Sequence, residues 1–185
     1  MPNWCDCDMY VSGPKADLEA FRVAALENVP ESDEKRDPEV LDVNNFIPYP
    51  EKYREMDRAV ERWYKENSVS GKKYGQLKPG VKFTDAPKDG FNSGGYEWCI
   101  QHWGTKWGIC RSKVRNVTQS SLVYRFECAW SPCLPVIVAM SEAFKTLKFM
   151  LKYFERGAAY KGVFVVKGGT IIRHKESEYS GNRGG

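Results

Sequence analysis

The sequence contains few of the residues from which catalytic and metal sites are usually built. Only two histidines occur, His102 and His174. No stretch approaches the ~18 consecutive apolar residues of a membrane-spanning helix. The first residues lack the basic and apolar regions of a signal peptide. These absences weigh against a hydrolase and a membrane protein, and they favour a cytoplasmic location.

The six cysteines show no recognisable zinc-binding spacing. Cys5 and Cys7 are separated by one residue and Cys128 and Cys133 by four, whereas zinc ribbons use a two-residue knuckle. In a cytosolic protein such cysteines are expected to be reduced thiols. The alternative is a zinc site on these four cysteines, with the two histidines as possible further ligands. We predict no metal and no cofactor.

Size and charge limit the kinds of function. The 185 residues, 42% of them hydrophobic and 14% aromatic, suit one domain or one domain with a large insertion. The net charge is only +4, so any affinity for nucleic acid must come from a local patch rather than from the overall charge.

Residues 90–107 form the most informative segment. Three of the six tryptophans, Trp98, Trp103 and Trp107, fall within ten positions. No acidic residue lies between Glu97 and Glu127, although this interval holds Lys106, Arg111, Lys113, Arg115 and Arg125. Aromatic rings interleaved with cations suit a flat anionic ligand, because the rings stack on its planar part and the cations meet its charge. The alternative is a corner of the hydrophobic core, since tryptophan buries a large area.

Lys106 is the strongest single candidate in this segment. Its ammonium could bind a phosphate or carboxylate while Thr105 and the Gly104 backbone donate hydrogen bonds; alternatively, it makes a stabilising cation–π contact. Trp4 and Trp130 are expected on neighbouring strands, as core residues. The predicted ligand-binding residues are Tyr96, Trp98, His102, Trp103, Thr105, Lys106, Trp107 and Arg111.

A catalytic interpretation is weaker. Cys99 and His102 are three residues apart and could form a nucleophile pair, and Glu97 could act as a general base. Such a pair is more often incidental packing, so we predict no catalytic residue and a protein that is not an enzyme.

Hydrophobic periodicity predicts the order strand, helix, strand, strand, helix, strand. This is the order of a ferredoxin-like sandwich, an α+β fold with two helices on one face of an antiparallel sheet. A final hairpin is expected at residues 162–166 and 170–174, around Gly168 and Gly169. The predicted elements are strands at 4–12, 105–117, 120–130 and 148–155, and helices at 15–26 and 135–147.

A large insertion follows the first helix. It begins with an acidic linker at residues 27–42, continues with a charged helix at 51–67, and then has a Gly-, Lys- and Pro-rich loop at 68–90. We predict a single domain over residues 1–174 with the insertion at about 28–104, and a flexible polar tail at 175–185.

Four ordered motifs carry a resemblance to a known family. Residues 1–5 (MPNWC), 90–99 (GFNSGGYEWC), 103–107 (WGTKW) and 129–132 (AWSP) resemble the YubB-like family. These are small proteins of phages and conjugative plasmids, described as having a ferredoxin-like domain. The resemblance implies that fold and a mobile-element origin. The chain departs from the family pattern at Cys7, Gly108 and Cys133, and the first two stand where the family tends to have asparagine.

Together, these features predict a non-enzymatic binder of a small anionic, nucleotide-like ligand. By analogy with small phage proteins, it would sequester a host immune signal in the host cytosol and so counter host defence. One alternative is binding of RNA or single-stranded DNA along the sheet and the basic strand from Arg111 to Arg115. Another is a protein–protein inhibitor of a host factor, using the acidic segment at 27–42 or exposed tryptophans as anchors.

Overall fold

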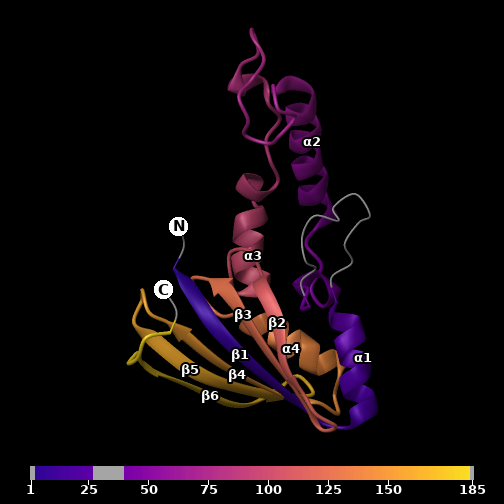
Figure 1. Ribbon diagram of the computed structural model, residues 1–185, viewed down its shortest axis with the longest axis vertical. Helices are drawn as coiled ribbons and strands as arrows, with labels where there is room; N and C mark the ends of the chain where they lie inside the picture. Colours follow the sequence, from indigo (N-terminus) through magenta and orange to yellow (C-terminus); the bar gives the residue numbers. More distant parts are fainter. Residues whose placement is uncertain (1–2, 27–39, 184–185) are drawn as a thin grey trace. The chain divides into compact units, whose positions relative to one another are not determined.

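The computed structural model describes residues 3–26 and 40–183 (Figure 1). The chain divides into two compact units. We call Met1–Pro48 with Cys99–Gly185 the sheet unit, and Tyr49–Trp98 the insert unit. The prediction of one domain over residues 1–174 stays a prediction. The described helices include none that is both long and apolar enough to cross a lipid bilayer.

The sheet unit is built on six strands in the order β2-β3-β1-β4-β5-β6, and every neighbouring pair is antiparallel. The order β2-β3-β1-β4, with one helix after β1 and one after β3, is that of the ferredoxin-like sandwich, so the predicted fold class is confirmed. A C-terminal hairpin widens the sheet by two strands (Figure 1). The elements are β1 (Trp4–Ser12), α1 (Lys15–Ala25), β2 (Ile109–Val117), β3 (Ser121–Ala129), α4 (Leu134–Ala143), β4 (Lys148–Glu155), β5 (Tyr160–Lys167) and β6 (Thr170–Glu178).

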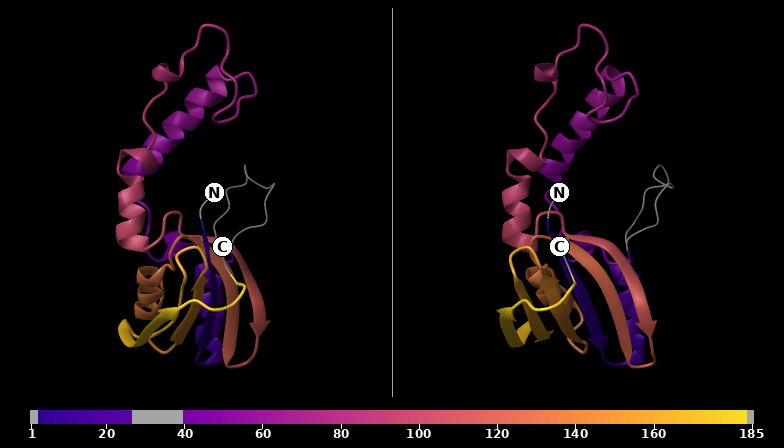
Figure 2. Two further views of the ribbon diagram at one scale, coloured as in Figure 1. Left: turned by 90° about the vertical axis from the view of Figure 1, so that its left-hand side faces the viewer. Right: turned by 60° about the vertical axis from the view of Figure 1, so that its left-hand side comes forward.

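The core lies between the sheet and its two helices, which cover the same face (Figure 2). Phe21 of α1 is completely buried and meets three aromatic rings edge-on. Its ring centroid is 6.0 Å from Tyr124, 5.4 Å from Phe144 and 5.2 Å from Phe149. Side chains alternate between the two faces of a strand, so the other face of this sheet carries a second, different set of residues.

Most predicted bounds agree with the structure within a few residues. The strand at 4–12, the helix at 51–67 and the strand at 148–155 are confirmed without change. The strand expected at 105–117 begins only at Ile109. Gly104 and Gly108 both have positive φ, of 74° and 78°, so the backbone turns there instead of extending.

Strand β6 is longer than predicted. It runs to Glu178, so residues 175–178, which the sequence assigned to the polar tail, continue the sheet. Beyond it, Arg183 donates to the carboxylates of Asp6 and Asp8. The charged end of the chain is therefore attached to the sheet through both backbone pairing and ion pairs.

The insert unit contains α2 (Glu51–Asn67), two short 3-10 helices, η3 (Phe83–Asp85) and η4 (Phe91–Ser93), and the start of α3 (Gly95–Trp103). Residues 68–90 are otherwise loop, as predicted. The Asp57 carboxylate accepts from the Gly90 amide at 2.9 Å. A Cβ at Gly90 would lie 2.1 Å from the Tyr53 carbonyl oxygen, so this position has no room for a side chain.

The acidic linker predicted at 27–42 falls mostly outside the described residues. Its end belongs to the sheet unit, where Leu41 is buried and its amide donates to the Ser112 Oγ at 3.1 Å. The Asp42 amide donates to the Ala25 carbonyl, and Asp42 then caps the 3-10 helix η2 (Val43–Asn45). The chain thus returns from α1 along the sheet unit before it enters the insert.

Candidate functional site

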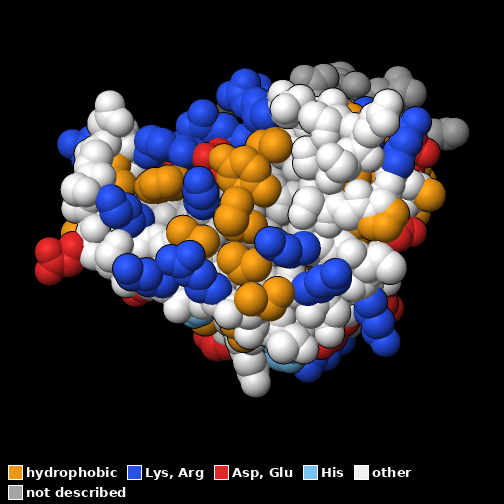
Figure 3. Space-filling view, turned by 90° about the horizontal axis from the view of Figure 1, so that it is seen from below, with side chains coloured by type: hydrophobic (Ala, Val, Ile, Leu, Met, Phe, Trp, Pro, Cys, Tyr) orange, Lys and Arg blue, Asp and Glu red, His pale blue; other side chains and the backbone are white. Residues whose placement is uncertain are grey.

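The sheet face opposite the helices, which we call the open face, is rich in cations. The β3–β1 register places Arg125 opposite Asp8 and Glu127 opposite Asp6 on this face, and Lys113 of β2 pairs with Arg125. Seen from below the view of Figure 1, the molecule shows Lys and Arg side chains on both sides of a band of hydrophobic side chains (Figure 3). An open face of this composition suits an anionic ligand.

A β-bulge in β2 decides which cations reach the open face. Cys110 pairs with Glu127 and Lys113 pairs with Arg125, so Arg111 and Ser112 together oppose one residue of β3. Arg111 has φ 53°, a conformation that non-glycine residues rarely adopt. Bulges of this kind redirect side chains. Here Ser112 is buried, while Arg111 and Lys113 are exposed.

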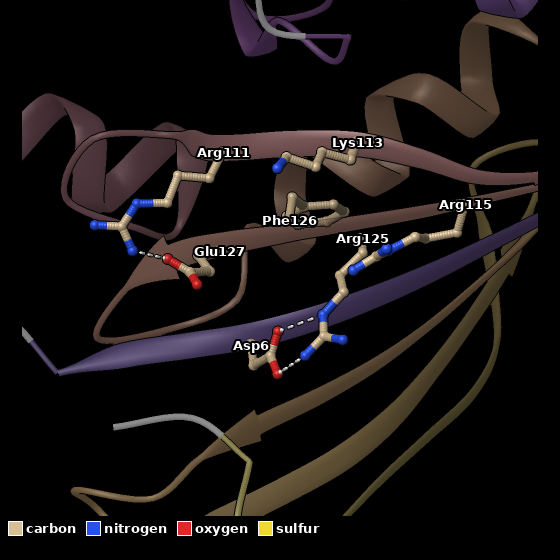
Figure 4. Close-up of a pocket in the computed structure, with 7 residues that line it drawn as sticks. All are labelled: Asp6, Arg111, Lys113, Arg115, Arg125, Phe126 and Glu127. Carbon is tan, nitrogen blue, oxygen red and sulfur yellow. Dashed lines mark hydrogen bonds and ion pairs between the residues drawn. The ribbon is translucent and has the colours of Figure 1, made fainter.

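A pocket of about 350 Å³ lies over β1, β2 and β3 (Figure 4). We call it the sheet pocket. Figure 4 shows its cations coming from two strands, Arg111, Lys113 and Arg115 from β2 and Arg125 from β3. Its lining is Asp6, Arg111, Lys113, Arg115, Arg125, Phe126 and Glu127.

The two carboxylates of the sheet pocket are already paired. Glu127 forms an ion pair with Arg111, and Asp6 accepts from Arg125 at 2.9 Å. Within the part of the chain that the structure describes, neither Lys113 nor Arg115 forms an ion pair. Two of the four cations of the pocket are therefore not paired with a carboxylate among the described residues.

Asp6 stays ionised at neutral pH despite being largely buried. Burial by itself raises the pKa of this carboxyl, but hydrogen bonds and charge from Arg125 and Arg183 outweigh it and lower the pKa below its ordinary value. The carboxylate thus orients Arg125 at one side of the pocket.

Next to the sheet pocket, three tryptophans and two cations form a cluster that we call the Trp cluster. The rings of Trp4 and Trp107 are 6.1 Å apart. The Lys106 ammonium lies 4.7 Å from the centre of Trp107 and 4.8 Å from the centre of Trp130. The Arg111 guanidinium lies 4.5 Å from the centre of Trp4. Arg111 therefore belongs to both the Trp cluster and the sheet pocket.

The Trp cluster presents large aromatic surfaces to solvent. Trp107 is 42% exposed and Trp130 is 43% exposed. Trp130 has φ 70° and is held on both sides, since its amide donates to the Asn3 carbonyl and its own carbonyl accepts from the Tyr160 hydroxyl. A strained, well-anchored and exposed tryptophan is a feature of binding sites rather than of cores.

Two of the residues predicted from sequence to bind a ligand lie instead in the interior. Thr105 is completely buried, and its hydroxyl donates to the Ala129 carbonyl at 2.9 Å. Trp103 is 5% exposed, and its indole Nε1 donates to the Ile47 carbonyl at 2.8 Å. Both side chains donate their hydrogen bonds to backbone carbonyls, and these bonds help to fix the loop that carries Lys106 and Trp107.

The other three predicted ligand-binding residues are not part of the Trp cluster or of the sheet pocket. Tyr96 and Trp98 are half-buried in the insert unit, where their rings contact Phe91 and Tyr49 respectively. His102 is half-buried in the last turn of α3. The structure thus groups Lys106, Trp107 and Arg111 from the predicted set.

Sequence reasoning missed several residues of the site. Trp4 and Trp130 were expected in the core, but the structure places them in the Trp cluster. Asp6, Glu127 and Arg125 were not singled out as site residues, although the run of cations without acidic residues from Lys106 to Arg125 did signal the region.

Five of the six cysteines are buried thiols, and Cys110 is half-buried. Cys5, Cys7, Cys128 and Cys133 have no exposed surface, and Cys99 is 2% exposed. Burial raises the pKa of the Cys7 thiol, so this group stays protonated. Among the described residues, no group of three or more His, Cys, Asp or Glu side chains is placed to hold a metal ion.

Comparison with known proteins agrees with the fold. Residues 102–183, which contain β2 to β6 and α4, match a family model described as the ferredoxin-like domain in Api92-like protein. The crystal structure of a protein api92 from Yersinia pseudotuberculosis superposes with a TM-score of 0.57 at 9% identity, covering 99% of this chain and 100% of that one. No curated protein matches the sequence. At this identity, the likeness to api92 concerns the fold alone.

Proposed function

We propose that the sheet unit binds an anionic, nucleotide-like ligand at the Trp cluster and the adjoining sheet pocket. The observation that carries this proposal is the position of Arg111, which stacks on Trp4 and also lines the pocket. A ligand with a planar ring beside a negative charge would contact both features at once. Nucleotides have this combination, because a base is joined to one or more phosphates.

The energetics favour such a ligand. Stacking of a base on an aromatic side chain contributes about 1–3 kcal/mol. Lys113 and Arg115 supply charge for a phosphate, and the guanidinium group of Arg115 can form two parallel hydrogen bonds to it. The Lys106 ammonium, held between Trp107 and Trp130, adds a further cation at the edge of the aromatic surface.

The same side chains argue for binding without chemical conversion. Guanidinium and ammonium groups donate hydrogen bonds and have no acceptor, so they suit binding of an anion rather than removal of a proton. The two carboxylates of the pocket are occupied by arginines. We therefore propose a binding protein rather than an enzyme.

The biological setting is a proposal drawn from the YubB-like motifs. We propose that the protein is an accessory factor of a phage or plasmid and that it sequesters a nucleotide signal of host defence. The exposed Trp107 and Trp130 would equally serve as anchors for a host protein, and the experiment below separates these functions.

The test is thermal unfolding in the presence of mono-, di- and cyclic nucleotides. A ligand at about a hundred times its dissociation constant should stabilise the folded protein by about 2.7 kcal/mol. Lys106→Ala and Trp107→Ala should abolish the shift without unfolding the free protein, and Lys72→Ala, in the insert unit, is the control. If no nucleotide raises the melting temperature, the small-ligand proposal is wrong, and an oligonucleotide or a protein partner becomes the better explanation.

A further inference from the structure

A second pocket, of about 370 Å³, lies over β4, β5 and β6. We call it the lysine pocket. Three lysines line it, Lys152 from β4, Lys161 from β5 and Lys175 from β6, together with Phe154. Among its described lining residues there is no carboxylate. Its composition therefore repeats that of the first site, with cations beside an aromatic ring.

The strand registers place the lysine pocket on the open face. Lys152 pairs with Val163, which in turn pairs with Lys175. Along β1, Asp8 pairs with Arg125 on one side and with Lys152 on the other. Directly paired residues point to the same face of a sheet, so Arg125 of the sheet pocket and the lysines face the same side.

The carboxylates between the two pockets are neutralised. Arg183 donates to Asp6 at 3.0 Å and to Asp8 at 2.6 Å. Its guanidinium also lies 4.3 Å from the centre of the Phe154 ring. Asp6 and Asp8 would otherwise repel an anion that crosses β1. With Arg183 in place, Asp6 and Asp8 are both paired with a guanidinium, which reduces this repulsion.

The distance between the pockets sets the size of the ligand. From β3 to β5 there are three steps of about 4.8 Å each, or about 14 Å in all. One nucleotide cannot occupy both pockets. Successive phosphates of a strand stacked as in a double helix advance about 3.4 Å along the axis, so even a fully stacked single strand spans this distance in roughly four steps.

We propose that the ligand of the open face is single-stranded nucleic acid, with phosphates in both the sheet pocket and the lysine pocket. This proposal rests on the proposed function, since the sheet pocket and the Trp cluster would bind one end of the strand. A single strand is favoured over a duplex because unpaired bases expose their faces to the exposed rings of Trp107 and Trp130.

The test is fluorescence anisotropy of the full chain with labelled oligothymidylates, from a dinucleotide to about twelve nucleotides long. Affinity should rise about tenfold or more once the strand exceeds about four nucleotides, and its salt dependence should steepen as more phosphates are neutralised. Oligouridylates of the same lengths show whether the strand is RNA or DNA. Polyphosphate of matched charge should bind more weakly, because it has no bases to stack.

Paired variants separate the two pockets. Lys161→Ala with Lys175→Ala should remove the gain with length and leave mononucleotide binding unchanged. Lys113→Ala with Arg115→Ala should weaken binding at every length. Lys72→Ala with Lys88→Ala, in the insert unit, makes the same change in net charge and is the matched control.

Each outcome decides between the proposals. If mononucleotides bind but affinity does not grow with length, or if polyphosphate competes as well as the oligonucleotides, the single-strand proposal is overturned and the nucleotide site stands. If neither nucleotides nor oligonucleotides bind, the proposed function itself fails.

Discussion

The guanidinium of Arg111 lies 4.5 Å from the centre of the Trp4 ring, although the strands that carry these residues are not neighbours. Strand β3 runs between them, and its residue opposite Trp4 is Ala129. A small residue at this position leaves room for the arginine to reach across. The contact joins the cationic pocket to the aromatic cluster and is the central structural relationship of the site.

Replacing Arg111 should separate binding from stability. Arg111→Gly removes the side chain and relieves the positive φ, whereas Arg111→Ala removes the side chain and keeps the strain. The glycine variant should therefore be more stable than the alanine variant by about 1 kcal/mol, measured by urea unfolding. Both should lose nucleotide binding to the same extent. Retained affinity in either variant would contradict the proposed role of Arg111.

Thr105 should matter for stability and not for binding. Thr105→Val keeps the shape of the side chain but leaves the buried Ala129 carbonyl without its donor, which should cost about 1–3 kcal/mol. Thr170→Val, at an exposed position of β6, is the control and should be nearly neutral. The measurement is urea unfolding together with nucleotide titration. A loss of affinity in a folded Thr105→Val protein would restore Thr105 to the binding site.

The ion pairs of Asp6 predict a loss of stability in acid. Its pKa in the folded protein lies below the ordinary value of 3.8, so its contribution is complete above that value and is lost as the pH falls through the folded-state pKa. Asp6→Asn should flatten the dependence of the unfolding free energy on pH below about 4. In Arg183→Gln one of the groups that lower the Asp6 pKa is removed, so the loss of stability in acid should begin at a higher pH. If the unfolding free energy of Asp6→Asn depends on pH below about 4 as it does in the unchanged protein, other carboxyl groups cause the loss of stability in acid.

Gly90 should be intolerant of a side chain. In Gly90→Ala the new Cβ would lie 2.1 Å from the Tyr53 carbonyl oxygen, so the insert unit must distort, at a cost of about 1–3 kcal/mol. Hydrogen exchange of the α2 amides should accelerate, while exchange in β1 stays unchanged. Ser93→Ala, at an exposed position nearby, provides the comparison. If the α2 amides of Gly90→Ala exchange as slowly as those of the unchanged protein, the backbone accommodates the new Cβ without losing stability.

The fold was predictable because its main signals are local. The alternation in residues 4–12 defines β1, and the order of elements then selects the ferredoxin-like sheet. The extent of β6 was not predictable, since its last residues are charged or polar and their pairing with β5 leaves no apolar alternation in the sequence. A strand at the edge of a sheet needs no apolar alternation when both of its faces are largely exposed.

The site was only partly predictable for a related reason. The run of cations without acidic residues identified Lys106 and Arg111, but no local pattern marks the bulge that directs Arg111 onto the open face. Sequence also does not show which face of a sheet is covered, so Trp4 was expected in the core. Trp103 could not be separated from Trp107, because only the folded loop places one indole against Ile47 and the other in solvent.

The most direct test of the account is a titration of tryptophan fluorescence with nucleotides. Stacking of a base on Trp107 or Trp130 should change the emission in a saturable way, and inorganic phosphate should not. In Trp107→Phe with Trp130→Phe, the change should be lost, while Trp63→Phe, in the insert unit, should keep it. A saturable signal that disappears only in the cluster variant is the predicted result. No saturable change with any nucleotide, or one that survives in the cluster variant, would contradict the account.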